Sequence, residues 1–506
     1  IARKYKLSQK SVKGLGMAFG VEWNKKGNKG MRELASPTKF LEQQFSITDE
    51  LRAYETWWET SGKKISEAVD RAGTPLLRMF DRFGARIDEI AFAPEYDTML
   101  YRGYSAGVIE KIFSEKSLLP SYQIGYVASF YDSGLYCPYT VSMSTAVPLS
   151  KYGAPDVREK FLPMMLKRDE SVWQGATWMT EARGGSDLGA NVETIARRDG
   201  DIWKMNGDKF FCSNVGAELA VVAARVEGAP SGVRGLALFL VPKFRGNGER
   251  NYFVRRLKSK IATRSVPTGE VELRDSEAYL VGTTDAGIYL ILEVLNLSRI
   301  ANSIGSVAVA QRAIAEAYNF AQHRVAFGKP LLEQPLMHAQ FEQRERELQH
   351  ASALAWYAAK LLDKVYLQTP PYSDRYHLFR LAAHLAKYHT AEFAAQTSKW
   401  AMEVHGSAGV LDEFPIERLL RESMILAIWE GAPHRQILDA LEVMKRKRAH
   451  ELLFHELAPR AEPHALEEIA ARVEHLLALS QNEMEAQSES VFRDFARLTA
   501  KTLSGV

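Results

Sequence analysis

The chain has 506 residues, of which 46% are hydrophobic and 25% charged, and its formal net charge is +3. This composition is typical of a globular protein with two to four domains, and it excludes disordered and fibrous classes. The two cysteines, Cys137 and Cys212, are too few for a disulfide framework, so we expect both to be small core residues of an intracellular protein. The apolar runs are strand-sized, well below the roughly 20 residues that span a bilayer, so no membrane span is expected.

The first 44 residues are predicted to form a basic arm. Residues 1–32 hold nine Lys or Arg against one acidic residue, Glu22. Such a leader is either a solvated arm, which is the favoured interpretation, or part of a mitochondrial presequence. Because the chain begins with Ile, we expect a processed or trimmed form, in the mitochondrial matrix of a eukaryote or otherwise in the cytoplasm.

Residues 45–170 are predicted to form an α-helical domain, because apolar residues recur every three and four positions, as in 57–72 and 99–113. At Ser171 the pattern changes to short β-rich runs separated by glycine turns, which predicts a small antiparallel β-domain over 171–282. The strands are expected at 192–197, 203–211, 219–226, 236–241, 253–257 and 270–273.

After Gly282 the sequence is again helical and rich in alanine. Short links between long amphipathic helices indicate an antiparallel four-helix bundle over 283–445, followed by a helical extension over 446–506. The fold class is therefore α+β and mostly α. A Rossmann fold is excluded, since the glycine cluster at 14–20 has the wrong spacing and follows no predicted strand. The bundle helices are expected at 288–323, 334–362, 374–405 and 415–444.

Two segments of the β-domain carry residues suited to a flat ligand. In 179–187, two adjacent glycines permit close approach of the backbone, while Thr180 and Ser186 offer hydroxyls, although a simple tight turn explains the segment equally well. In 206–214, a hairpin leads into a strand that presents Phe211 and Ser213. That strand is either an ordinary core strand or one wall of a flavin site, which needs an apolar face and a few directed hydrogen bonds.

Three segments of the bundle carry further candidate groups. Arg324 ends the first helix, where its guanidinium suits a pyrophosphate or simply complements the helix terminus. The glycines in 403–410 either expose amides to a phosphate or serve an interhelix turn. Glu430 stands between Trp429 and Gly431, and a carboxylate desolvated by such a ring becomes a base near neutrality, unless it is solvated at a helix end.

These five segments, in this order, resemble the acyl-CoA dehydrogenase family over roughly residues 45–445. The first family signature is satisfied within 180–190, except that Trp178 stands where a small residue is usual, and the second is complete within 403–422. The fit is closest to the alkylation-response, AidB-like branch, as in the stretches 136–140 and 334–337. Two long patterns in the expected domains are far more specific than a single motif.

The resemblance implies FAD, acyl-CoA chemistry and a homotetramer, a dimer of dimers, in which each flavin is shared between subunits. Phe211 replaces the usual Trp, Glu403 a usual Gln, and Ala432 lacks a common hydroxyl. The residues expected to contact the cofactor are Met179, Thr180, Gly185, Ser186, Phe211, Cys212, Ser213, Arg324, Phe327, Gly406, Gly409, Trp429 and Gly431; those expected at the substrate are Ser186, Arg299 and Glu430.

Glu430 is predicted to be the base. Some branches of the family place the base one position before an arginine that matches Arg299, but this chain has Ser298 there. The resemblance therefore implies removal of the α-proton of a fatty acyl-CoA by Glu430, hydride transfer to the flavin, and a trans-2-enoyl-CoA product. Arg299 is expected either to orient the substrate or to support the fold. No metal is expected.

Two other functions compete with this prediction. The altered residues around the predicted flavin site are compatible with a protein that binds and sequesters acyl-CoA with little turnover. The AidB-like branch suggests a DNA-associated stress role, but the basic run 445–448 is followed by five Lys or Arg against ten Asp or Glu, which opposes phosphate affinity. DNA is therefore an unlikely partner, and electron-transfer flavoprotein and oxygen are both possible electron acceptors.

Overall fold

The computed structural model describes residues 34–505. The basic run at 1–32 lies outside these residues. The described end of the predicted arm is packed rather than solvated: α3 (Pro37–Leu41) begins after the N-cap Ser36 and buries Phe40 and Leu41. The arm therefore ends earlier than residue 44.

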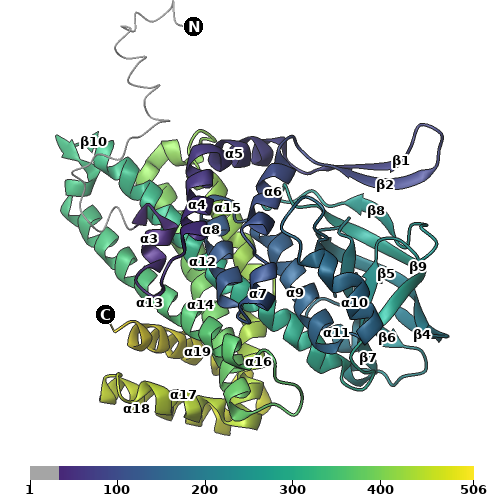
Figure 1. The fold of residues 1–506 in the computed structure, drawn as a ribbon. Coiled ribbons are helices and arrows are strands. Elements are labelled where there is room, and N and C mark those ends of the chain that lie inside the picture. The colour runs from purple at the N-terminus through teal and green to yellow at the C-terminus, as the bar shows by residue number, and fades with distance from the viewer. Residues whose placement is uncertain (1–33, 506) are drawn as a thin grey trace, which may run out of the picture.

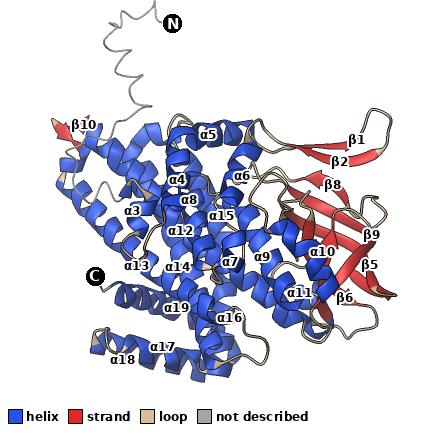
Figure 2. Ribbon diagram, viewed as in Figure 1, coloured by secondary structure: helices blue, strands red, loops and turns tan. Residues whose placement is uncertain are grey.

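The N-terminal domain is helical, with one exception. A two-stranded antiparallel hairpin of β1 (Leu76–Phe80) and β2 (Arg86–Ala91) extends from it (Figures 1 and 2). The prediction of an all-helical domain was wrong here, because the sequence of β1, with four apolar residues in five, carries no regular alternation of apolar and polar residues. The helices are α4 (Asp49–Trp57), the π-helical turn η2 (Trp58–Gly62), α5 (Lys63–Ala72), α6 (Tyr96–Ser105), α7 (Glu110–Ser114), α8 (Leu119–Tyr131), α9 (Tyr136–Tyr152) and α10 (Pro155–Met165).

The middle domain is a seven-stranded sheet that closes on itself, because β6 pairs with both β4 and β7. Most pairs are antiparallel, as predicted, but β3 and β4 each run parallel to β6. Its interior forms a separate core around Trp178, Phe239 and Tyr252. The strands are β3 (Gly175–Trp178), which was not predicted, β4 (Ile195–Asp199), β5 (Ile202–Ser213), β6 (Leu219–Val226), β7 (Leu236–Pro242), β8 (Phe253–Leu257) and β9 (Thr268–Val281).

The C-terminal bundle is built on α12 (Gly287–His323), whose flanks are buried along most of its length against α8, α9, α13 and α14. The helices α13 (Pro335–Val365) and α14 (Asp374–His405) follow the predicted boundaries closely. The fourth predicted helix is two helices, α15 (Ile416–Ile428) and α16 (Pro433–Lys447). The break between them holds Glu430, so the error in the prediction falls at the candidate base.

The C-terminal extension folds back on the bundle as α17 (Ala449–Leu457), α18 (Pro463–Ala478) and α19 (Gln481–Ser504) (Figure 1). The ring of Tyr388 on α14 meets Phe492 on α19, with centroids 5.2 Å apart. The extension thus covers the outer face of α13 and α14, on the side away from the middle domain. Among the described helices, none combines the length and apolarity that crossing a membrane requires.

Candidate functional site

Glu430 lies in a sharp turn between α15 and α16. Its φ is +58°, in the left-handed region, and Gly431 follows with φ +102°. Pro433 then opens α16, where a missing amide proton costs nothing. Glu430 therefore lies in the turn and not on the face of either helix.

Three buried side chains hold this turn by its carbonyl groups. Arg299 Nε and Gln436 Nε2 donate to the Glu430 carbonyl at 3.2 and 3.0 Å. Lys387 Nζ donates to the carbonyls of Ala427 and Gly431 at 2.9 and 2.7 Å. Because the strained backbone is held from α12, α14 and α16 together, its conformation is fixed by tertiary contacts.

Glu430 is half-buried, and its carboxyl is not neutralised by a direct partner among the described residues. Its Oε2 is buried and makes no hydrogen bond with the described residues. Burial raises the pKa of Glu430 to about 7, and the nearby positive charges of Arg299 and Lys387 oppose that rise. A carboxyl with this pKa can take up a proton at neutral pH and release it again.

The turn of Glu430 forms one wall of the candidate site, and the middle domain forms the other. The loop after β3 turns back at Glu181, whose carboxylate pairs with the fully buried Lys209 at 2.6 Å and accepts from Thr194. The Thr180 carbonyl accepts from the Phe210 amide at 2.9 Å. The loop that carries Thr180, Gly185 and Ser186 is therefore anchored beside the end of β5.

The end of β5 presents alternate residues to the two faces of the sheet. Phe211 is 51% exposed and Ser213 is partly exposed, whereas Cys212 is fully buried in the middle-domain core. A flavin contact from residue 212 would therefore come from its main chain. Trp178, the departure from the family signature, also lies in that core, edge-on to Tyr252, and leaves the outer face free.

Cys137, at the start of α9, connects the two walls. The Ser213 hydroxyl is hydrogen-bonded to its thiol, and the charges of Glu430 and Lys260 both act on it. Burial raises the pKa of this thiol to about 11, so it is a neutral lining group. Cys137 is only partly buried, unlike the simple core residue that was predicted. Ser213, at the end of β5, and the predicted base thus both lie near Cys137.

The remaining predicted cofactor residues lie at another place. Arg324 and Phe327 are exposed on the small hairpin of β10 (Val325–Ala326) and β11 (Lys329–Pro330), at the end of the bundle remote from the β-domain (Figure 1). Gly406 and Gly409 lie at the same end, because the rings of Phe320 and His405 stack there at 4.4 Å. One chain therefore divides its predicted FAD residues between two distant surfaces.

Ser298, which stands where some branches of the family carry the base, makes an ordinary structural contact. The hydroxyl of Ser298 lies 3.1 Å from that of Ser144 on α9, in the buried domain interface. Beside it, the guanidinium of Arg299 also bonds Asn296 and Asp439, both at 3.1 Å. These contacts favour the supporting role predicted for Arg299, and its role at the substrate stays a prediction.

Sequence reasoning missed Lys387, Gln436, Cys137 and Lys260. The first two lie on helix faces that resemble any other buried face. Cys137 offered one signal, since it stands in the 136–140 stretch that resembles the AidB-like branch. Nothing local in the sequence marks Lys260.

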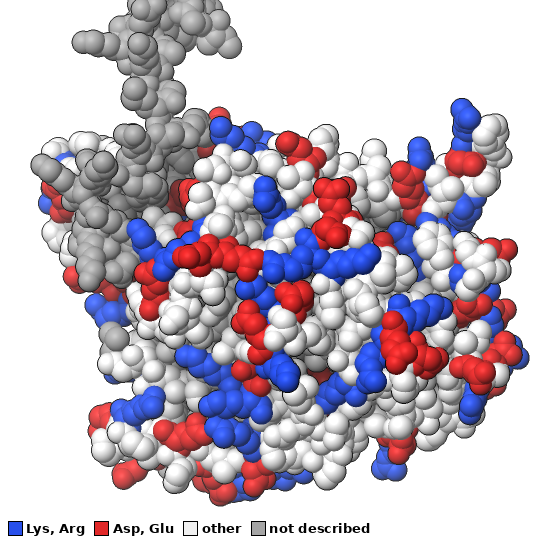
Figure 3. Space-filling model, in the orientation of Figure 1, with Lys and Arg blue, Asp and Glu red and all other residues white. Residues whose placement is uncertain are grey.

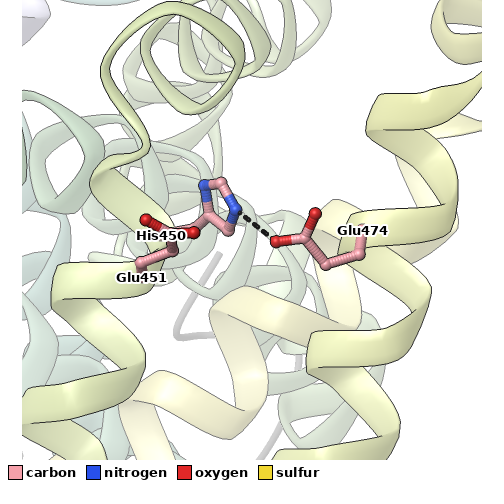
Figure 4. A group of neighbouring side chains, drawn as sticks. All are labelled: His450, Glu451 and Glu474. Atoms are coloured by element: carbon pink, nitrogen blue, oxygen red, sulfur yellow. Dashed lines mark hydrogen bonds and ion pairs between the residues drawn. The ribbon is translucent and has the colours of Figure 1, made fainter.

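A group in the extension has the residue types of a metal site. His450, Glu451 and Glu474 offer ligand atoms within 4.8 Å of one another, and the imidazole of His450 points to Glu474 at 3.0 Å (Figure 4). Arg448, however, bonds Glu451 and Glu474 at 2.6 and 2.8 Å. The ion pairs of Arg448 thus link α17 to α18.

The same arginine bears on nucleic-acid binding. Within the basic run 445–448, Arg448 forms ion pairs with Glu451 and Glu474, and Arg446 lies 3.5 Å from Glu442. On the face drawn in Figure 3, Lys and Arg lie among Asp and Glu. These features offer no uniformly basic surface on that face.

Comparison with known proteins places this arrangement in a family. The AidB N-terminal domain matches residues 47–170, the acyl-CoA dehydrogenase middle domain 176–276 and the acyl-CoA dehydrogenase C-terminal domain 285–444. Acyl-CoA dehydrogenase family member 11 of Caenorhabditis elegans is 29% identical, over 78% of this chain and 67% of its own length. Putative acyl-CoA dehydrogenase AidB of Escherichia coli is 28% identical, over 74% of this chain and 70% of its own length.

Solved structures agree with this result. The apo form of Bd2924 superposes with a TM-score of 0.84 at 25% identity, over 94% of this chain and 96% of its own. ACDH-11 of C. elegans in complex with C11-CoA has a TM-score of 0.76 at 22% identity, over 94% of this chain and 85% of its own. Because three domain models follow one another from residue 47 to 444, the chain belongs to the acyl-CoA dehydrogenase family of flavin-dependent oxidoreductases, with the N-terminal domain of its AidB-like branch.

Proposed function

We propose that the protein dehydrogenates a fatty acyl-CoA between its α- and β-carbons, giving a trans-2-enoyl-CoA, with FAD as cofactor and Glu430 as base. The observation that carries this proposal is the Glu430 carboxyl, which has a raised pKa and a buried oxygen, Oε2, without a partner among the described residues. A buried carboxyl oxygen without a hydrogen-bond partner lowers the stability of the folded protein, and such groups with shifted pKa values are typical of functional sites.

The residues of the site fit a flavin. Phe211 offers apolar surface, and Ser213 a hydroxyl, at the end of β5, and the mostly buried Met179 follows β3. Trp429 Nε1, next to the base, is buried without a partner, as is Glu430 Oε2. Flat apolar walls with a few unsatisfied polar groups suit an aromatic heterocycle. When bound, FAD supplies the acceptor for the two electrons and the hydrogen that leave the β-carbon.

The chain's own residues would activate the α-carbon. The Glu430 carboxylate takes the α-proton, and the left-handed turn fixes its direction. The Glu430 amide makes no hydrogen bond among residues 34–505, so it is available to donate to the thioester carbonyl as negative charge develops there. Trp429, Phe211 and Met179 keep water from the slot, which strengthens both interactions.

The relatives support this choice of substrate. The C. elegans structure that shares the fold contains C11-CoA, and the E. coli relative is described as a putative acyl-CoA dehydrogenase. The separated positions of Arg324 and Glu430 support a homotetramer in which the phosphates of one FAD are held by a neighbouring chain. The acceptor of the flavin's electrons is proposed to be electron-transfer flavoprotein or oxygen.

A sequestering role is the second candidate. Glu403 is exposed at the predicted phosphate surface and paired with Lys399, so a negative charge is carried where the resemblance implies FAD phosphates. This charge weakens cofactor binding unless Lys399 stays paired with it. Tight binding of acyl-CoA without reduction of the flavin would identify this role.

The base is tested by Glu430→Gln, in which the carboxyl can no longer take up a proton. We expect this variant to retain FAD but to lose flavin bleaching by acyl-CoA by about a thousandfold or more. Glu422→Gln is the matched control, because Glu422 on α15 is also buried with a pKa of about 7 but bonds the Thr263 amide between domains. Unchanged bleaching in Glu430→Gln would remove Glu430 from the mechanism.

A further inference from the structure

Lys260 is a half-buried cation that forms no ion pair with the described residues. It lies in the loop between β8 and β9, where its Nζ donates to the Val266 carbonyl at 2.9 Å and to Thr268 Oγ1 at 2.8 Å. No carboxylate of residues 34–505 lies within ion-pair distance of it. Two other lysines near this wall are paired, Lys258 with Glu270 and Lys209 with Glu181, at 2.7 and 2.6 Å.

The position of Lys260 is defined by its neighbours. Thr268, which accepts from it, is paired in the sheet with Ser213, the last residue of β5. The charge of Lys260 also acts on the thiol of Cys137, which is hydrogen-bonded to Ser213 and is influenced by Glu430. Lys260 therefore lies at the end of the wall formed by Phe211 and Ser213, on the side that faces the candidate base.

Lys260 remains charged in this position. Burial lowers the pKa of its ammonium group to about 8, and Cys137 and Glu422 act in the opposite direction. At pH 7 the group is thus mostly protonated. The groups that face it are Cys137 from α9, Glu422 from α15 and Thr268 from β9. Cys137 and Thr268 are neutral, and Glu422, whose pKa is about 7, balances the charge only in part at neutral pH and forms no ion pair with Lys260. A buried positive charge of this kind is costly unless a ligand interacts with it.

We propose that Lys260 lends its positive charge to the flavin site and raises the reduction potential of the bound flavin. The inference rests on the proposed function for the place of the flavin. An isoalloxazine that has taken up two electrons and one proton carries a negative charge, whereas the oxidised ring is neutral. A cation beside it stabilises the reduced form selectively, and low-dielectric surroundings increase the effect.

The test is the midpoint potential of the FAD-loaded protein, measured by anaerobic equilibration with a redox dye at pH 7. Lys260→Gln keeps a donor for the Val266 carbonyl but removes the charge. We expect the ratio of reduced to oxidised flavin at a fixed potential to fall about tenfold, which is about 30 mV for a two-electron couple. Lys260→Arg keeps the charge and is expected to keep the wild-type potential.

The control is Lys204→Met, because Lys204 lies on β5 but is paired with Glu277 at 3.4 Å away from this wall. It should leave the potential unchanged. Equal potentials in the wild type and in both Lys260→Gln and Lys260→Met would overturn the proposal. So would weaker acyl-CoA binding at an unchanged potential, which would place Lys260 at the substrate. The measurement needs bound FAD but no turnover, so a failure of the proposed dehydrogenation is seen separately, as missing bleaching by acyl-CoA.

Discussion

Among residues 34–505, two carboxyl groups have a pKa raised to about 7, and one of the two has the surroundings of a base. Glu422 is buried between domains, where its Oε1 accepts from the Thr263 amide at 2.9 Å and Arg418 lies nearby. The Oε2 of Glu422 is unpaired, as is that of Glu430. Glu430, however, lies in a turn where Arg299 and Gln436 bind its carbonyl, and no hydrogen bond among residues 34–505 reaches either oxygen of its carboxyl. A raised pKa therefore does not identify a base by itself; the direction of the hydrogen bonds does.

Lys387 is a positioning residue for Glu430. It bonds two carbonyls of the turn, and its positive charge lowers the pKa of Glu430 against the effect of burial. Burial lowers the pKa of Lys387 itself to about 7, so its charge is partly present at neutral pH. In Lys387→Met that charge is lost, so the pKa of Glu430 rises further and a smaller fraction of the base is ionised at pH 7. We expect the pH midpoint of flavin bleaching by acyl-CoA to move up, by at most about one unit.

The shift has a definite sign. At pH 7 the Lys387→Met variant should bleach several-fold more slowly than the wild type, and near pH 9 the two rates should converge, because both carboxyls are then ionised. The control is Lys364→Met, an exposed lysine at the end of α13. If the rate falls equally at every pH, Lys387 supports the fold without tuning the base.

At the scale of elements, periodicity predicted the regular segments and failed at the functional break. The helix ending at His405 and the strands at Leu219–Val226 and Phe253–Leu257 match the prediction, because each buries one continuous face or core segment. The apolar pattern of 415–444 also continues through the turn of Glu430. Gly431 and Pro433 are local signals of a helix break, which the apolar periodicity outweighed in the prediction. The conformation of the turn itself depends on contacts from Arg299, Lys387 and Gln436, which periodicity does not reveal.

Gly431 is required by this break. Its φ of +102° is open to glycine alone, and an added Cβ would lie 2.6 Å from Gln436 Nε2, which bonds the Glu430 and Gly431 carbonyls. We expect Gly431→Ala to lower the free energy of unfolding by about 2–4 kcal/mol. Bleaching by acyl-CoA should be lost as well. Urea denaturation followed by circular dichroism measures the first effect.

The matched control is Gly200→Ala. Gly200 also has a positive φ, +62°, but an added Cβ meets nothing within 4 Å. That variant carries backbone strain alone, so it should lose about 1 kcal/mol and keep its activity. If Gly431→Ala behaves like Gly200→Ala, the contact with Gln436 does not hold the turn.

At the scale of the whole molecule, the predicted FAD residues lie on two surfaces, and one of them has the character of an interface. The end of the bundle that carries Arg324 exposes several large apolar side chains, and Phe327 is 98% exposed. Such a patch is unfavourable in water unless another chain covers it. The exposed apolar residues at this end are Val325, Phe327, Leu336, Val410 and Leu411.

Sequence could identify this surface only through the family resemblance. Arg324 and the glycines at 406 and 409 are separated from Glu430 in space, so nothing in one folded chain brings the two groups together. Neither composition nor periodicity carries information on a second chain. The role of these residues therefore depends on assembly, and it is tested with assembled chains.

Complementation between two variants tests whether FAD is shared. Glu430→Gln lacks the base but keeps Arg324, whereas Arg324→Ala lacks the phosphate contact but keeps Glu430. If Arg324 serves the site of a neighbouring chain, a mixed pair contains one intact site and one with both defects. Doubly tagged mixed oligomers should then bleach with acyl-CoA at up to about half of their sites.

The control replaces Arg324→Ala with a chain that carries both substitutions, so that no intact site can form and no bleaching is expected. FAD content, read from the visible spectrum, separates lost cofactor from lost chemistry. If the mixed oligomer bleaches no more than the Arg324→Ala oligomer alone, Arg324 acts within its own chain or not at all. The remote end of the bundle would then be an assembly surface without a role in holding FAD.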